Sequence, residues 1–298
     1  MSNWNNRYLV AGIRLEVLSS VGDPTSFFPS AMEDFISPGP ADLIIEFKED
    51  ERAQADPLRR FFPPQFTAVR GDEGLSFEGA GGGRERLGTI FPGCARGEMG
   101  LPFLDRSWRI AEEEEAVREA VQAFMRACLQ CRLMEAGGTF LHAAGVVFEG
   151  MGYVFAGHTR AGKTTLTREF PAAAVLGDDL VAVGEAAGGF ELFGTPWPGR
   201  EGGAVAYGGV PLRAVLNLHP ELEPGLHPQS AAEAAAELAS NAPRMGYADE
   251  ESKLLGVFSS LVGAAPIYRM SMRLGDDVMP FLRSIASEQD GGVGIDGP

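Results

Sequence analysis

The residues with the most specific chemistry in this sequence form a glycine-rich loop. The run Gly157-His158-Thr159-Arg160-Ala161-Gly162-Lys163-Thr164 fits the pattern G-x-x-x-x-G-K-[ST]. In such a loop the backbone N–H groups surround a β-phosphate, the lysine reaches the β- and γ-phosphates, and the threonine hydroxyl ligates Mg²⁺. An apolar segment precedes the motif, and a helix-like segment that begins with Lys163 follows its second glycine. The pattern predicts a nucleotide-binding site over residues 157–165. A glycine-rich surface turn is the alternative.

Two side chains are unusual for such a loop, which commonly carries small residues between its glycines. His158 and Arg160 occupy variable positions of the pattern, so neither needs to obstruct a phosphate. We expect His158 to face solvent. For Arg160 three directions stay open, namely solvent, the γ-phosphate and an incoming acceptor.

Two adjacent acids, Asp178 and Asp179, follow the apolar segment 172–176. A carboxylate there can ligate the Mg²⁺ of a bound nucleotide, and one close to the γ-phosphate can accept the proton of an attacking hydroxyl. Successive residues of a regular strand face opposite ways, so both acids reach one site only if the chain bends. A solvated Gly-Asp-Asp turn is the alternative.

His142 lies near the start of an apolar segment that a turn at residues 149–152 would pair with the segment before the loop. Antiparallel pairing around that turn sets residue 142 opposite about residue 159, beside the loop. A histidine there can contact the γ-phosphate or act on the two aspartates. An ordinary packed or hydrogen-bonded histidine is the alternative.

The segments FLHAAGVVFEGMGYVFAGHTRAGKTT and VLGDDLVAV together resemble the HPr kinase/phosphorylase-like kinases, relatives of phosphoenolpyruvate carboxykinase. That family places a histidine about fifteen residues before the first loop glycine and a double aspartate on the following strand, which matches His142 and Gly157 here. The resemblance covers about residues 138–220. It implies that His142 lies near the transferred phosphate and that Lys163 and Thr164 hold phosphate and metal. It also implies that Asp178 and Asp179 provide a metal ligand and the catalytic base.

The stretch FGTPWPGREGG resembles the loop after the double aspartate in HPr-kinase-related proteins, some of which accompany peptide-modifying enzymes. The resemblance implies that Glu201 reaches the metal and Arg200 the phosphate. A surface loop with Trp197 packed beneath it is the alternative. The fuller Glu-Ile-Arg-Gly signature of HPr kinases proper is not seen, so HPr itself is not the expected acceptor. Further basic residues that could reach a phosphate are Arg213, Arg269 and Arg273.

The elements around these residues favour an α/β fold, with a P-loop kinase core of the HPr kinase/phosphoenolpyruvate carboxykinase type and a β-rich N-terminal region. Residues 1–110 form that region, with strands at 7–18 and 42–47. Four glutamates begin a predicted connecting helix over 111–137, and Gly137 ends it. The core spans 138–289 and a flexible tail 290–298. Its expected strands are 140–148, 152–157, 172–183 with an interruption, 209–218 and 266–274, and its expected helices start at 163, 230 and 251.

The composition restricts the partners. The 298 residues carry a net charge of −16, which disfavours binding to nucleic acid or to an anionic membrane surface. No apolar stretch approaches the ~20 residues of a spanning helix, and the start shows no signal-peptide pattern, so we expect a cytoplasmic protein. The cysteines Cys94, Cys128 and Cys131 do not suggest a disulfide framework, and the latter two are expected to be buried in a helix. His219 and His227 are expected to be ordinary loop residues.

These features together predict an ATP-dependent kinase that uses Mg²⁺ and transfers the γ-phosphate to a Ser or Thr hydroxyl of a peptide or small protein. The class of acceptor follows from the resemblance alone. A small-molecule kinase and a non-catalytic nucleotide-sensing accessory protein remain alternatives, and the oligomeric state, including a homo-oligomer, stays open. His142 with the two aspartates favours an enzyme, because nucleotide binding alone does not require them.

Overall fold

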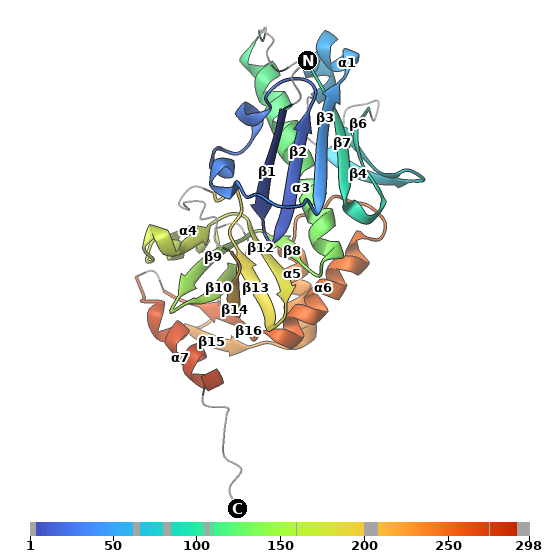
Figure 1. Cartoon of the computed structure of the whole chain (residues 1–298). Coiled ribbons are helices and arrows are strands. Elements are labelled where there is room, and N and C mark those ends of the chain that lie inside the picture. Colours follow the sequence, from blue (N-terminus) through green and yellow to red (C-terminus); the bar gives the residue numbers. More distant parts are fainter. Residues whose placement is uncertain are drawn as a thin grey trace, which may run out of the picture. The chain divides into compact units, whose positions relative to one another are not determined.

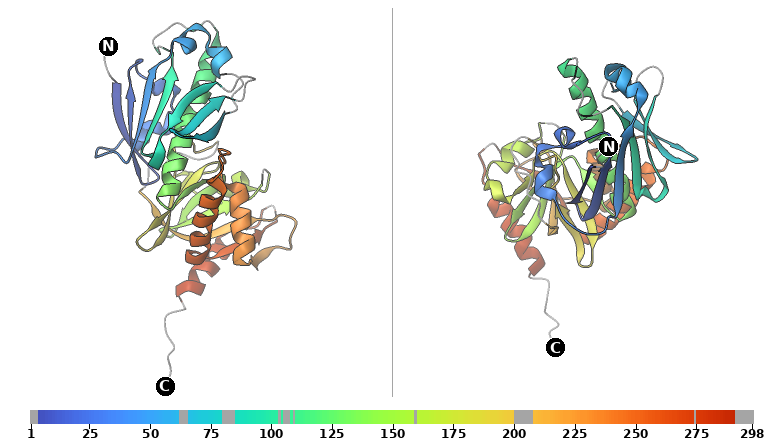
Figure 2. Two further views of the ribbon diagram at one scale, coloured as in Figure 1. Left: turned by 90° about the vertical axis from the view of Figure 1, so that its right-hand side faces the viewer. Right: turned by 45° about the horizontal axis from the view of Figure 1, so that its top comes forward.

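The computed structural model describes residues 4–61, 66–79, 85–102, 104, 108, 110–158, 160–199, 208–273 and 275–290. The chain is a mixed α/β protein with two mixed sheets and divides into two units (Figures 1 and 2). Unit 1 comprises Met1–Thr139 and Arg244–Leu254, and unit 2 comprises Phe140–Pro243 and Leu255–Pro298. Within the described ranges, no helix combines the length and apolar character that crossing a membrane requires.

Unit 1 is built on a seven-stranded sheet with the order β1-β2-β3-β7-β6-β5-β4. The strands are β1 (Trp4–Val10), β2 (Ile13–Ser19), β3 (Leu43–Glu49), β4 (Phe66–Gly71), β5 (Gly74–Gly79), β6 (Arg86–Ile90) and β7 (Arg96–Leu101). Strand β3 runs parallel to both β2 and β7, and the other neighbours are antiparallel. The short helices α1 (Glu51–Ala55) and α2 (Pro57–Phe61) follow β3.

The long helix α3 (Ala111–Glu135) lies along one face of this sheet and contacts β2, β3 and β7 (Figure 2). Its first turn carries Glu112, Glu113 and Glu114, and Gly137 with φ +77° follows its C-terminal end, as the sequence predicts. Cys128 and Cys131 are buried and free. Burial raises the pKa of the Cys128 thiol, which fits an unreactive core residue.

The prediction of one strand over residues 7–18 is wrong, because these residues belong to a two-stranded hairpin. Ala11 and Gly12 both adopt positive φ, +52° and +78°, and form the two-residue turn between β1 and β2. Positive φ at both central positions is the geometry of the tight hairpin turns that suit twisted strands. The sequence Ala-Gly is a weak signal for that turn, since alanine seldom adopts this conformation.

Unit 2 contains a nine-stranded sheet in which β11-β9-β10-β14-β13-β12-β8 form one path and β16 pairs with β14 and β15. The strands are β8 (Thr139–Leu141), β9 (Ala143–Phe148), β10 (Met151–Ala156), β11 (Val175–Gly177), β12 (Val181–Ala186), β13 (Gly189–Phe193), β14 (Val210–Leu218), β15 (Gly225–Pro228) and β16 (Ile267–Ser271). Three neighbours, β10, β14 and β16, run parallel to one another. The helices of this unit are α4 (Lys163–Thr167), α5 (Ala231–Asn241) and α7 (Met279–Asp290), and the part of α6 (Glu250–Ala264) from Leu255 onward also belongs to it.

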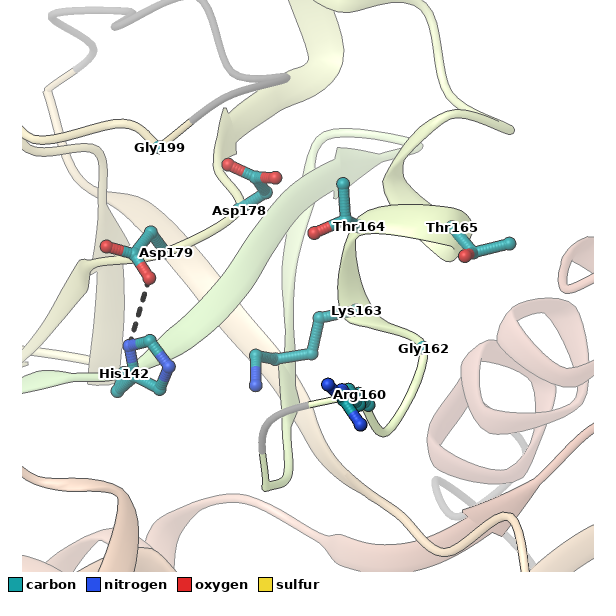
Figure 3. A pocket seen from close by; sticks show the side chains of 9 residues that line it. All are labelled: His142, Arg160, Gly162, Lys163, Thr164, Thr165, Asp178, Asp179 and Gly199. Atoms are coloured by element: carbon teal, nitrogen blue, oxygen red, sulfur yellow. Dashed lines mark ion pairs between the residues drawn. The ribbon is translucent and has the colours of Figure 1, made fainter.

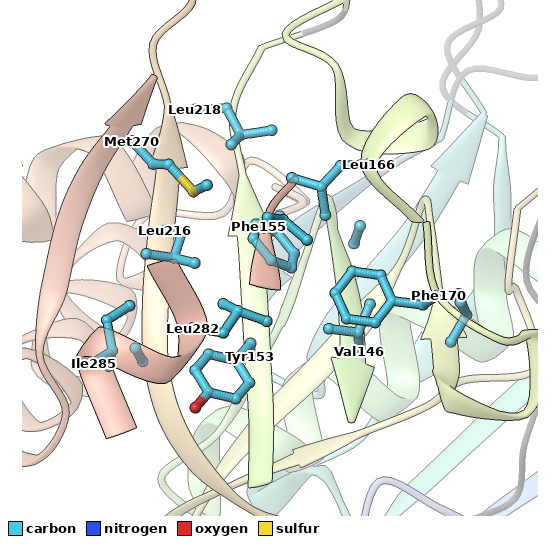
Figure 4. Packing of buried hydrophobic residues seen from close by; sticks show 14 residues of the cluster. Val146, Tyr153, Phe155, Leu166, Phe170, Leu216, Leu218, Met270, Leu282 and Ile285 are labelled. Atoms are coloured by element: carbon cyan, nitrogen blue, oxygen red, sulfur yellow. The ribbon is translucent and has the colours of Figure 1, made fainter. Parts of the chain in front are cut away.

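The core of unit 2 fixes this sheet beneath the glycine-rich loop. Tyr153 and Phe155 of β10 pack with Leu166 of α4 and with Leu282 and Ile285 of α7 (Figure 4). All five side chains are buried. Alternate residues of β10 therefore anchor the strand that leads directly into the loop.

Several element boundaries in unit 2 differ from the predicted ones. The strand expected over 140–148 is interrupted at His142, and the hairpin turn is shorter than expected, because Phe148 already pairs with Met151. The last pair of that hairpin is Ala143 with Ala156, which contradicts the predicted register of residue 142 against residue 159. Strands β13 and β15 and helix α7 were not predicted. The tail at 291–298 lies outside the described residues.

Candidate active site

The glycine-rich loop connects β10 to α4 and depends on backbone conformations that glycine allows. Gly157 has φ +149° and Gly162 has φ +107°, and a Cβ on Gly157 would lie 3.0 Å from the Ala161 Cβ. Arg160 also adopts a positive φ, +73°, which is uncommon for a residue with a side chain. His158 is exposed, as expected, whereas Thr159 lies outside the described residues.

Lys163 is a buried cation at the end of this loop. Its side chain is largely buried, and its Nζ donates hydrogen bonds to the carbonyl oxygens of Gly157 at 2.6 Å and His158 at 3.2 Å. Burial lowers the pKa of Lys163, and the negative charges of Asp179 and Asp178 oppose this shift. The ammonium group of Lys163 is thus held by the loop backbone, and the negative charges of Asp179 and Asp178 favour its charged form.

The two aspartates occupy a bend between β11 and β12, so the bend that the sequence required is present. Asp178 is buried, and its backbone N–H donates to the Pro198 carbonyl at 2.8 Å. Asp179 is exposed over 58% of its side chain. The two carboxylates therefore differ in their access to solvent, so they can serve different functions at one site.

His142 occupies the break between β8 and β9. Its backbone N–H donates to the Asn241 carbonyl at 2.7 Å, which fixes the chain at this irregular point. Its Nδ1 lies 3.1 Å from Asp179 Oδ1 (Figure 3). Although the predicted strand register is wrong, the structure brings this histidine to the aspartates.

One cavity of about 770 Å³ joins these groups (Figure 3). Its lining consists of His142, Arg160, Gly162, Lys163, Thr164, Thr165, Asp178, Asp179 and Gly199. Three predicted loop residues, Gly157, His158 and Ala161, do not line this cavity, and Arg200 and Glu201 lie outside the described residues. The loop and the acids, distant in sequence, therefore face a common space.

Gly199 is a site residue that sequence reasoning missed. It has φ +90°, and a Cβ at this position would lie 1.9 Å from Asp178 Oδ1. The carboxylate of Asp178 thus occupies the space that any other residue at 199 would need. The Pro-Gly pair after Trp197 was the available signal. Trp197 itself is buried and forms a T-shaped ring pair with Phe140, with ring centroids 6.2 Å apart.

The other basic candidates do not line this cavity. Arg213 donates to the backbone carbonyl of Ala286, and Arg269 forms ion pairs with Glu237 and Glu233. Arg273 lines a second cavity, which shares part of the loop with the first. Arg160, whose direction the sequence left open, lines both cavities.

Among the described residues, no group of three or more His, Cys, Asp or Glu side chains is arranged to hold a metal ion. Comparison of the chain with protein-family models and with curated proteins gives no match. The function of the cavity is therefore inferred from the residues that line it.

Proposed function

We propose that this protein is an ATP-dependent kinase with a P-loop core of the HPr kinase/phosphoenolpyruvate carboxykinase type. The single observation that carries the proposal is the shared cavity of Lys163, Asp179 and His142. A phosphate-binding lysine suffices for nucleotide binding. The paired histidine and carboxylate add a group that can accept a proton, which transfer to a hydroxyl requires.

The residues present fit Mg²⁺, which takes one or two protein ligands together with phosphate oxygens and water. Thr164 and Asp178 line the same cavity and would hold the ion, so a dedicated cluster of three acidic ligands is not required. Bound Mg²⁺ would neutralise charge on the phosphates. Lys163 would add a fixed positive charge where the γ-phosphate is bound.

Asp179 is the better candidate for the base, because its side chain is accessible whereas Asp178 is buried against Gly199. In the proposed step the acceptor oxygen bonds to the γ-phosphorus while its proton passes to Asp179. The bond between the γ-phosphorus and the bridging oxygen breaks, and that oxygen leaves on ADP. His142 would orient the Asp179 carboxylate through its Nδ1 contact.

The acceptor is proposed to be a Ser or Thr hydroxyl on a peptide or small protein, on the basis of the sequence resemblance. The test is incubation of the full chain with labelled ATP and peptides encoded by neighbouring genes, followed by identification of the labelled product. A panel of small hydroxyl compounds addresses the small-molecule alternative. ATP binding without any transfer to either panel would favour the nucleotide-sensing alternative.

Three variants separate binding from transfer. Lys163→Ala should lose most nucleotide affinity, and retention of full affinity would overturn the nucleotide site. Asp178→Asn and Asp179→Asn, tested singly, should bind ATP while at least one abolishes transfer. Wild-type transfer rates in both would overturn the assignment of base and metal ligand to this pair.

A further inference from the structure

A second cavity, of about 330 Å³, lies next to the first in unit 2. Arg160, Gly162 and Thr165 line both cavities, so the two spaces meet at the glycine-rich loop. The second cavity also has an apolar wall, formed by Leu166, Leu218, Met270 and Met272, and polar groups from Glu169, His219 and Arg273. It contains neither of the two aspartates nor His142.

The topology places this cavity where α/β proteins bind ligands. Strands β10, β14 and β16 are adjacent and parallel, so their carboxyl ends meet at one edge of the sheet. The glycine-rich loop follows β10, His219 follows β14 and Met272 follows β16. All three connections line the second cavity, and crevices outside the carboxyl ends of parallel strands are common ligand sites.

Strand pairing and hydrogen bonds hold the floor of this cavity in place. Leu218 and Met270 are paired across β14 and β16, and the His219 N–H donates to the Met270 carbonyl at 2.8 Å. His219 is held from both sides, by Glu221 at 2.6 Å and Glu237 at 3.2 Å. Contacts within the protein thus hold this part of the cavity lining, as is usual for small-molecule pockets.

We propose that the second cavity binds the nucleoside part of the nucleotide whose phosphates the glycine-rich loop holds, a proposal that rests on the proposed function. A volume of about 330 Å³ falls within the range of small-molecule pockets. The apolar wall, which includes the partly exposed Met272, suits the faces of a planar base, because the thioether is polarisable and adapts to aromatic rings. Arg273 and Glu169 provide hydrogen-bonding groups at the polar side.

In this proposal the two cavities bind different parts of the nucleotide. The first holds the acids and histidine and so receives the γ-phosphate and the acceptor. The second, which the two aspartates do not line, holds the base and ribose. Thr165, which lines both cavities, then lies where the phosphate chain joins the nucleoside.

The test compares Mg²⁺·ATP with Mg²⁺·tripolyphosphate, which has the phosphate chain without the nucleoside, by titration calorimetry on the full chain. Wild type should bind ATP at least about tenfold more tightly than tripolyphosphate. Met272→Trp, which fills the cavity, should weaken ATP binding at least about tenfold and change tripolyphosphate binding less than about twofold. Met272→Ala should weaken ATP binding in the same direction by a smaller factor.

Met279→Trp is the matched control, because Met279 is also partly buried against the core of unit 2 but does not line the cavity. It should leave both affinities unchanged. If neither Met272 variant changes the affinity for ATP, the proposed nucleoside site is overturned. If tripolyphosphate binding still depends on Lys163 in that case, the proposed function remains supported. Failure of wild type to bind either compound overturns both proposals.

Discussion

His142 Nδ1 lies 3.1 Å from Asp179 Oδ1, although the two residues lie in different connections between strands of the unit 2 sheet. His142 interrupts the path from β8 to β9, and Asp179 lies in the bend between β11 and β12. Each side chain is about half exposed, so an acceptor in the cavity has access to both. Under the proposed function, the His142 imidazole would orient the Asp179 carboxylate, the proposed proton acceptor.

The His142–Asp179 contact leads to a prediction about the turnover of His142 variants. His142→Ala should lower the turnover of the proposed kinase by about 100-fold with little change in ATP affinity, because an unoriented carboxylate is a poor base. His142→Gln, which keeps a hydrogen-bond donor, should recover part of the loss if orientation is the role. The measurement is kcat alongside the ATP dissociation constant for each variant. Equal losses in both variants would point instead to proton transfer by the imidazole.

The second prediction concerns Gly199, whose lack of a side chain leaves room for the Asp178 carboxylate. Gly199→Ala should reduce transfer by about 100-fold, since a displacement of about 1 Å at a reacting group can cost that much. Gly150→Ala is the control, since Gly150 has a similar φ of +78° and a Cβ added there would meet nothing within 4 Å. The measurement is the steady-state rate of phosphate transfer for both variants. An equal reduction in the two rates would show that backbone strain alone, and not the displacement of Asp178, causes the loss of activity.

Arg60 and Arg52 both contact Asp50 in unit 1 but differ in burial. The Arg60 side chain is 2% exposed and also bonds Glu85, whereas that of Arg52 is 67% exposed. Arg60→Ala should lower the free energy of unfolding by about 3–5 kcal/mol, because it leaves a carboxylate without its buried partner. Arg52→Ala should cost at most about 1 kcal/mol. Chemical denaturation of the full chain measures both, and similar losses would contradict the difference in burial.

His219 makes the stability of unit 2 depend on pH. Burial disfavours its charged form, but hydrogen bonds to Glu221 and Glu237 outweigh this and raise the pKa of His219 above its usual value of about 6.5. The folded state therefore binds a proton more tightly than the unfolded state. The resulting stabilisation is fully present below about pH 6.5 and is lost as the pH rises through the raised pKa.

The measurement is the difference in unfolding free energy between wild type and His219→Gln across that pH window. The difference should be largest in acid and shrink as the pH rises. A difference that stays constant with pH would show that protonation of His219 contributes nothing to the fold.

The sequence alone was sufficient for features that depend on local chemistry. The spacing from Gly157 to Thr164 marks a loop after an apolar strand, and the structure has β10 before it and α4 after it. The glutamates in the first turn of α3 and Gly137 after its end mark the two ends of the helix, because capping and dipole effects act within one turn. The adjacency of Asp178 and Asp179 required a bend, and a bend is present.

Only the tertiary structure decided which distant residues share a cavity. The position of His142 beside Asp179 depends on the order of strands in the sheet and on a hairpin turn two residues shorter than the sequence suggested. The role of Gly199 depends on the approach of the 198–199 backbone to Asp178. The second cavity depends on the parallel alignment of β10, β14 and β16. These are long-range pairings, set by the packing of the whole core, and no local pattern in the chain encodes them.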